Sequence, residues 1–113
     1  MEHIRLATKE EVEKIQATSD LTRASAVFAL KDNFAVLRPC LELDPVIFRE
    51  GSSRSEKHAF VFGLFSGLTM QGTIGEVYFN VHADNEEFIK ILDTAGCVRT
   101  STAPEFRYKK VLQ

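Results

Sequence analysis

The sequence predicts an α/β domain of the α+β kind, with three helices packed on a central mixed, mostly antiparallel sheet of about six strands. Three observations lead to this prediction. Residues 76–82 alternate between polar and apolar side chains, the period-two pattern of a half-buried strand. A helix with recognisable ends follows at 84–96, and another strand and capped helix open the chain at 3–15. Each strand with its helix supplies half of a sheet-and-helix layer.

Length and composition set the broad class. The 113 residues, 44% of them hydrophobic and 27% charged, suit a single domain spanning 1–113. The net charge is −2 and both signs are scattered along the chain, which argues against a nucleic-acid partner. We see no signal peptide and no apolar run long enough for a bilayer, so we expect a cytoplasmic protein without a membrane partner. Cys40 and Cys97 lie in apolar surroundings, and we expect reduced thiols.

The chain begins with a short strand and a capped helix. Ile4 and Leu6 alternate with polar neighbours over residues 3–7. Thr8 and Glu11 have the spacing of a capping box, in which each side chain accepts a hydrogen bond from the other residue's backbone N–H. A helix is therefore expected directly after Thr8.

Two antiparallel strands are expected next, at 26–31 and 34–43. The dipeptide Asp32-Asn33 tolerates positive φ and suits a tight hairpin turn between them. Pro39 has no backbone donor, so it should lie at a bulge or an edge. The Phe-rich edge of this hairpin is also a surface through which a homodimer could form.

A loop rich in small residues then leads into a helix expected at 55–71. Gly51, Ser52 and Ser53 leave backbone N–H groups accessible just before the helix, and such groups bind phosphate through fixed dipoles. Arg54 could face an anionic group there or simply face water. The alternative for the whole segment is a flexible turn that caps the helix.

The sequence contains signals for both the start and the end of a helix at 84–96. Asp84 is expected to cap it, with Glu87 completing a box-like pattern, and Gly96 is expected to end it in a left-handed conformation. Between them, apolar side chains form a one-sided stripe. Two strands at 97–101 and 105–112 are expected to close the chain as a hairpin.

The segment from residue 76 to Gly96 resembles the C-terminal half of the GNAT superfamily of N-acetyltransferases. The family pattern there is a strand, Asn, x-x-Ala, x-x-x-Tyr, x-x-x-Gly-Phe. Asn85 and Gly96 stand at the Asn and Gly positions with the family's spacing. Phe88, Leu92 and Cys97 replace the Ala, Tyr and Phe. The change to Leu92 bears on activity, because that Tyr commonly protonates the leaving thiolate.

The resemblance extends to the loop before the second helix. The family's acetyl-CoA segment has the form Val-x-Pro-x-Tyr-Gln/Arg-Gly-x-Gly-x-Gly/Ala, and Pro45, Gly51 and Ser53 match it. Phe48 and Arg49 stand where Gln or Arg and then Gly are expected. The element order matches the family minus one helix and one strand, which implies a pared-down GNAT-like fold. The resemblance implies acetyl-CoA as the cofactor, bound by Gly51, Ser52, Ser53, Arg54 and Asn85.

Acetyl transfer to an amine needs a cleft between two splayed strands, a base for the ammonium proton and a donor for the departing sulfur. The splayed strands would be 34–43 and 75–82. Glu42 is the candidate base, and Tyr78 is the candidate donor in place of the missing family Tyr. The structural alternatives are that Tyr78 faces water and that Glu42 pairs with Arg38.

Three functions remain open on the sequence. The first is an acyltransferase acting on an amine of a small molecule or a protein. The second is a GNAT-fold protein that has lost its cofactor site and binds another protein. Short GNAT-like proteins of tailed phages are similar in outline, and the partner would then be a host protein in the host cytoplasm. The third is an unrelated α+β binding module. No metal cluster, Ser/His/Asp arrangement or P-loop is present in the sequence.

Overall fold

The computed structural model describes residues 4–73, 75–101 and 105–112, and these form a mixed α+β fold with one seven-stranded sheet. The α+β class is confirmed, and the strand count is seven rather than about six. The expected turn at 102–104 lies outside the described residues. Along the chain the elements are β1 (Arg5–Leu6), α1 (Lys9–Gln16), β2 (Ala26–Leu30), β3 (Asn33–Arg38), the 3₁₀-helix η1 (Pro39–Leu41), β4 (Glu42–Ile47), α2 (Arg54–Met70), β5 (Gly75–His82), α3 (Glu86–Thr94), β6 (Val98–Arg99) and β7 (Glu105–Leu112).

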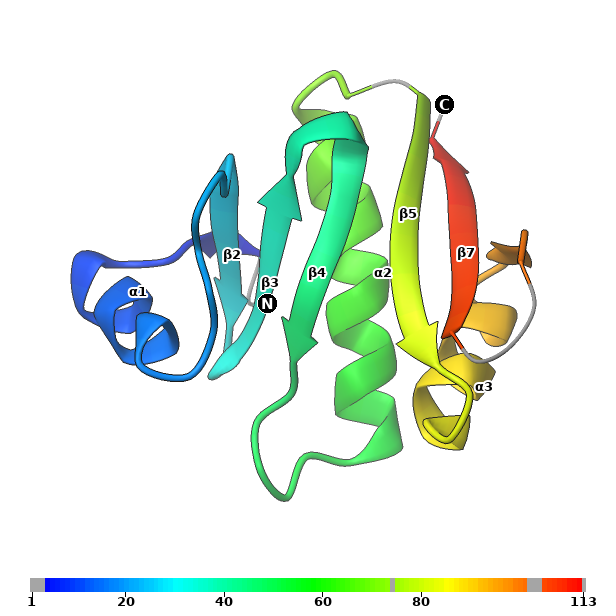
Figure 1. Cartoon of the computed structure of the whole chain (residues 1–113), viewed down its shortest axis with the longest axis horizontal. Coiled ribbons are helices and arrows are strands. Elements are labelled where there is room, and N and C mark those ends of the chain that lie inside the picture. Colours follow the sequence, from blue (N-terminus) through cyan, green and yellow to red (C-terminus); the bar gives the residue numbers. More distant parts are fainter. Residues whose placement is uncertain (1–3, 74, 102–104, 113) are drawn as a thin grey trace.

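The strands lie in the order β1-β2-β3-β4-β5-β7-β6. All neighbours are antiparallel except β4 and β5, which run parallel, so the expected mixed and mostly antiparallel sheet is confirmed. Every residue of β4 and β5 is described, and the two strands pair at two positions, Glu42 with Tyr78 and Leu43 with Phe79. Beyond these pairs the strands diverge, as Figure 1 shows. The splayed strands are therefore β4 and β5.

The prediction of one continuous strand at 34–43 is wrong, because this segment contains β3, a turn and the start of β4. The division accounts for the extra strand. Pro39 opens a turn of 3₁₀-helix, and Leu41 adopts a positive φ of 57° at its end. The chain therefore reverses, and β4 returns antiparallel to β3 from Glu42 onward. The apolar residues around Pro39 continue the strand-like composition through the turn, which is why the sequence pattern does not separate the two strands.

The hairpin between β2 and β3 turns one residue earlier than expected. Lys31 and Asp32 have φ values of 50° and 64°, and Asn33 already pairs with Leu30 in the ladder. Two consecutive positive φ values are typical of a two-residue hairpin turn. Asn33 is therefore not a turn residue but a fully buried strand residue.

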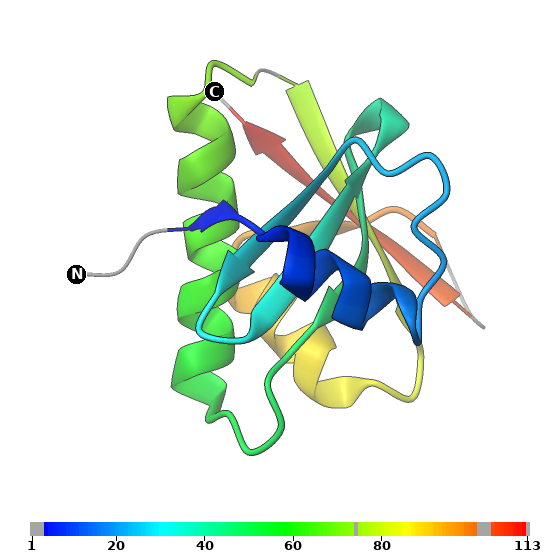
Figure 2. The same cartoon turned by 90° about the vertical axis from the view of Figure 1, so that its left-hand side faces the viewer.

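The helices lie on both faces of the sheet. Side chains of α2 and α3 pack against one face in the larger core, which includes Phe60, Leu64, Phe79 and Leu92. Ile15 of α1 packs on the opposite face against β2 and β3. Figure 2 shows α1 on the side of these strands away from α2. Figure 1 shows that no helix lies over the front of β4, β5 and β7. No helix within the described ranges is long and apolar enough to cross a membrane.

The helix caps confirm one prediction and correct another. Thr8 and Glu11 form the expected capping box before α1. At α3 the cap is Asn85, whose Oδ1 accepts a hydrogen bond from the backbone N–H three residues on, rather than Asp84. Glu87 does not form the expected capping interaction with Asp84. Its carboxylate forms an ion pair with Lys57 of α2 instead.

One cysteine can be described in full. Cys97 is a free, buried thiol next to the end of α3. Burial raises its pKa to about 11, because the apolar surroundings disfavour the thiolate. The thiol is therefore protonated at neutral pH. The side chain of Cys40 lies outside what the structure describes.

Two glycines of α2 offer a test of the packing at the start of the chain. A Cβ added at Gly67 would meet Ile4 at 3.8 Å, whereas one at Gly63 would lie 3.0 Å from Ile4 Cγ1. Alanine is favoured over glycine in a helix by up to about 1 kcal/mol. We therefore expect Gly67→Ala to raise the free energy of unfolding, measured in urea, by about 0.5 to 1 kcal/mol. Gly63→Ala should gain less or lose stability, and an Ile4→Ala background should restore the gain. Equal gains at both glycines would contradict this packing.

Candidate functional site

The two predicted catalytic residues lie side by side where β4 and β5 pair. Glu42 and Tyr78 are direct register partners across the two strands. Their neighbours Leu43 and Phe79 are buried under α2 and α3, so Glu42 and Tyr78 point to the opposite face, on the helix-free part over β4, β5 and β7. The structure therefore brings together two residues that the sequence suggested separately.

A third residue joins them from β7. One guanidinium nitrogen of Arg107, Nη1, donates to Glu42 Oε2 at 3.1 Å and to Asn80 Oδ1 at 3.0 Å. The guanidinium carbon lies 4.3 Å from the centroid of the Tyr78 ring. Sequence reasoning did not single out Arg107. The sequence did contain a signal for its position. Arg107 lies between Phe106 and Tyr108, which face the core, and side chains alternate along a strand, so Arg107 must face away from the core.

Arg38 is the register partner of Glu42 across β3 and β4, but its guanidinium does not bond to the Glu42 carboxylate. Its guanidinium donates to three backbone carbonyl oxygens, those of Asp20, Thr22 and Asp44, at 2.5, 2.8 and 2.7 Å. Through these bonds the loop after α1 is tied to β4. The expected cross-strand pairing of Glu42 with Arg38 is therefore confirmed in the strand register, but the guanidinium of Arg38 bonds to backbone carbonyls and the carboxylate of Glu42 bonds to Arg107.

The hydroxyl of Tyr78 is also engaged on this face. It donates to Glu76 Oε2 at 2.5 Å, and Lys109 Nζ lies 3.5 Å from Glu76 Oε1. The hydrogen bond from Tyr78 lowers the pKa of Glu76, and it raises the pKa of Tyr78. Tyr78 therefore holds its proton at neutral pH, which is the form that a general acid needs.

Aromatic side chains connect the diverging ends of β4 and β5 on the helix side. Phe48, directly after β4, packs edge-on against Phe60 of α2 at 6.2 Å and Phe88 of α3 at 5.6 Å between ring centroids. Phe88 in turn packs edge-on against Phe79 of β5 at 6.0 Å. Such edge-to-face contacts stabilise aromatic clusters beyond their burial alone. Phe48 is thus part of the core.

Arg49, Glu56 and Asn33 form a hydrogen-bonded cluster that holds the loop between β4 and α2, and the name latch refers below to these three residues. Arg49 Nη2 lies 2.6 Å from Glu56 Oε1. Asn33 Oδ1 accepts from the Arg49 backbone N–H at 2.7 Å, and its Nδ2 donates to Glu56 Oε2 at 3.1 Å. Hydrogen bonds from Arg49 and Asn33 lower the pKa of Glu56 to about 2. Sequence reasoning missed this role of Asn33, because it placed the residue in the turn.

The residues assigned to a cofactor fall at two helix starts. Gly51 has a φ of 79°, and no described atom lies within 4 Å of the position its Cβ would take. Ser53 caps α2, and Arg54 is the exposed first residue of that helix. The Oγ of Ser52 is buried without a hydrogen-bond partner among the described residues. Asn85 caps α3 instead of reaching the loop.

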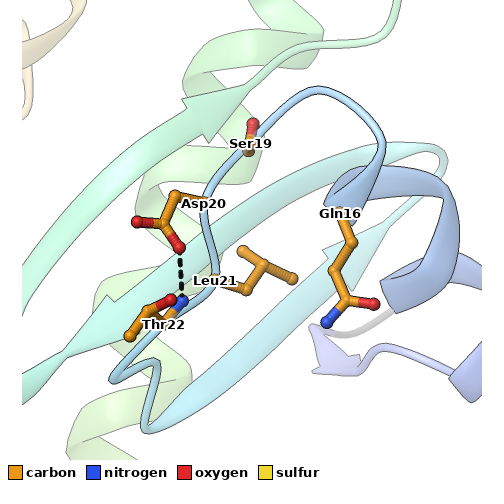
Figure 3. Close-up of a pocket in the computed structure, with 5 residues that line it drawn as sticks. All are labelled: Gln16, Ser19, Asp20, Leu21 and Thr22. Carbon is orange, nitrogen blue, oxygen red and sulfur yellow. Dashed lines mark hydrogen bonds between the residues drawn. The ribbon is translucent and has the colours of Figure 1, made fainter.

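Two surface hollows lie away from these residues. One, of 380 Å³, lies at the loop after α1. Figure 3 shows the residues that line it, among which Asp20 Oδ1 accepts a hydrogen bond from the Thr22 N–H at 2.8 Å. The other, of 650 Å³, lies between α2 and β7 and is lined by residues that include Phe65, Met70 and Val111. Neither hollow is lined by Glu42, Tyr78 or the loop at 51–54.

Within residues 4–73, 75–101 and 105–112, no group of three His, Cys, Asp or Glu side chains could hold a metal ion. Comparison of the sequence with models of known protein families gave no match, and comparison with curated proteins gave none either. A functional proposal therefore rests on the geometry of the site and on the resemblance carried by the sequence.

Proposed function

We propose that this chain is an N-acyltransferase with a pared-down GNAT-like fold, which moves an acetyl group from acetyl-CoA to an amine of a small molecule or protein. The observation that carries the proposal is the pair of parallel strands β4 and β5. They pair over two positions, diverge toward the start of α2, and present Glu42 and Tyr78 at the point of pairing. Acetyl transfer requires two strands that splay apart, and this divergence, with the candidate base and acid at one end of it, supports the proposal.

The loop before α2 fits the pyrophosphate of the cofactor. Open space in front of Gly51, backbone donors at a helix start and the unpartnered Ser52 hydroxyl suit an anionic group. Phe48 is turned into the aromatic cluster and Arg49 is held by Glu56, so neither side chain fills the space at Gly51.

The chemistry assigns a separate role to each candidate. Acetyl-CoA would supply the thioester, whose acyl carbon gains the new C–N bond while its C–S bond breaks. Glu42 would take the proton that the ammonium loses, and Tyr78 would give its hydroxyl proton to the departing sulfur. Leu92, at the position of the family Tyr, is fully buried and has no proton to give. The donor must therefore come from another position, and Tyr78 is adjacent to Glu42.

Calorimetric titration with acetyl-CoA tests the proposal. We expect micromolar binding that Gly51→Trp abolishes, because the indole would occupy the space in front of the loop. Gly72→Trp is the matched control, since Gly72 also has a positive φ, 82°, and open space at its Cβ position, but lies at the other end of α2. Loss of binding in Gly51→Trp alone would support the loop as the cofactor site. No binding by the unmodified protein at millimolar acetyl-CoA would contradict the proposal.

A second candidate function is a GNAT-fold protein without catalysis that binds another protein, a host protein if the source is a phage. The observation that favours it is the engagement of both candidate groups, Glu42 by Arg107 and Tyr78 by Glu76. The same titration separates the two functions. A protein that fails to bind acetyl-CoA but retains a specific protein partner in a pull-down would support the second.

A further inference from the structure

We infer that Glu42, Tyr78 and Asn80 form a binding subsite for an ammonium or guanidinium group, which Arg107 fills in this structure. Identification of the external cation with the acyl acceptor rests on the proposed function. The subsite itself rests on the contacts of Arg107 alone. Below, the name cation subsite refers to these three residues.

The cation subsite combines three kinds of group that attract organic cations. Glu42 supplies a carboxylate oxygen, Asn80 supplies an amide oxygen and Tyr78 supplies the face of an aromatic ring. Arg107 meets them at 3.1 Å, 3.0 Å and 4.3 Å, respectively. A charge-assisted hydrogen bond, a neutral acceptor and a cation–π contact together select a cation that also donates hydrogen bonds.

The occupant can leave without disturbing the sheet. The backbone of Arg107 is held independently, because its N–H donates to Ser101 Oγ and its carbonyl accepts from Thr100 N–H. The side chains of Arg107 and Glu42 are 37% and 24% exposed, so solvent reaches the ion pair. Figure 1 shows that this face of β4, β5 and β7 has no helix over it. An external cation can therefore exchange with the guanidinium.

The position of the cation subsite suits the acceptor of the proposed reaction. A primary ammonium bound to Glu42 would lie at the pairing point of β4 and β5, next to the base that must take its proton. Arg107 is then an internal competitor that the acceptor displaces. The substrate class is a primary amine, whose ammonium takes the place of the Arg107 guanidinium beside Glu42 and over the Tyr78 ring.

Arg107→Ala provides the test, because it leaves the Glu42 carboxylate without its guanidinium. The probe is propylammonium chloride, compared with sodium chloride at equal ionic strength, and the readout is the thermal unfolding midpoint. We expect propylammonium to raise the midpoint of Arg107→Ala by about 2 to 5 °C through binding to the folded state. We expect a smaller shift in the unmodified protein and in Arg107→Lys, where the internal cation competes with the probe, and no shift in Arg107→Ala combined with Glu42→Gln. Lys109→Ala, which removes another cation from the same face of β7, should respond no more than the unmodified protein.

The absence of a shift in Arg107→Ala, or an equal shift when Glu42→Gln is added, would overturn the inference. Should Arg107→Ala not fold, Arg107→Gln serves in its place, since it retains the aliphatic stem and removes the charge. None of these samples contains acetyl-CoA. A cation response without acetyl-CoA binding would therefore reject the proposed function and support the cation subsite. Acetyl-CoA binding without a cation response would support the proposed function and reject the cation subsite.

Discussion

Replacing Phe88 by alanine is expected to lower the free energy of unfolding by about 4 kcal/mol, the range found for removal of a buried Phe side chain. Phe88 is 7% exposed and packs edge-on against both Phe48 and Phe79. Its ring links the end of β4 to β5 through α3, so its loss leaves a cavity and separates contacts that come from three elements. Urea unfolding monitored by circular dichroism would measure the change.

Phe62→Ala is the matched control for Phe88→Ala. Phe62 lies on α2, is 44% exposed and stacks on His58 at 4.5 Å between ring centroids. Because water already reaches this ring, we expect a loss of about 1 kcal/mol or less. Similar losses for the two variants would contradict the placement of Phe88 at the centre of the aromatic cluster.

Replacing Asn33 by leucine is expected to cost about 3 kcal/mol, because three partly buried hydrogen bonds are lost at about 1 kcal/mol each. Asn33 is fully buried, and its amide group serves the Leu30 carbonyl, the Arg49 backbone N–H and Glu56. Leucine has a similar size but no polar atom, so the loss would be one of hydrogen bonds rather than of volume. Urea unfolding again measures the stability.

The same variant should release the loop between β4 and α2. Trypsin cuts after Arg49 and Arg54, so we expect faster cleavage there in Asn33→Leu than in the unmodified protein. Asn80→Leu is the control, because Asn80 accepts one hydrogen bond from Arg107 on the part of the sheet surface that no helix covers. It should cost about 1 kcal/mol and leave cleavage of the loop unchanged. Unchanged cleavage in Asn33→Leu would contradict the latch.

Local patterns in the sequence determined several elements closely. The Thr8 capping box, the strand at Gly75–His82 and the strand at Glu105–Leu112 lie where they were predicted, and Gly96 ends α3 at a positive φ of 84°. In each case the signal is carried by residues within one or two turns, or by alternation along one strand. Such signals depend on the backbone and on nearest neighbours, so they need no knowledge of the fold.

The tertiary structure alone decided how these elements make a site. Glu42 and Tyr78 were suggested by the sequence, but their pairing, the divergence of β4 from β5 and the arrival of Arg107 depend on strands 36 to 65 residues apart in the chain. Asn33 likewise forms hydrogen bonds to Arg49, in the loop after β4, and to Glu56, in α2. Its role therefore depends on where these elements lie in the fold. Sheet order and cross-strand contacts are set by burial of the whole core, and no short stretch of sequence contains that information.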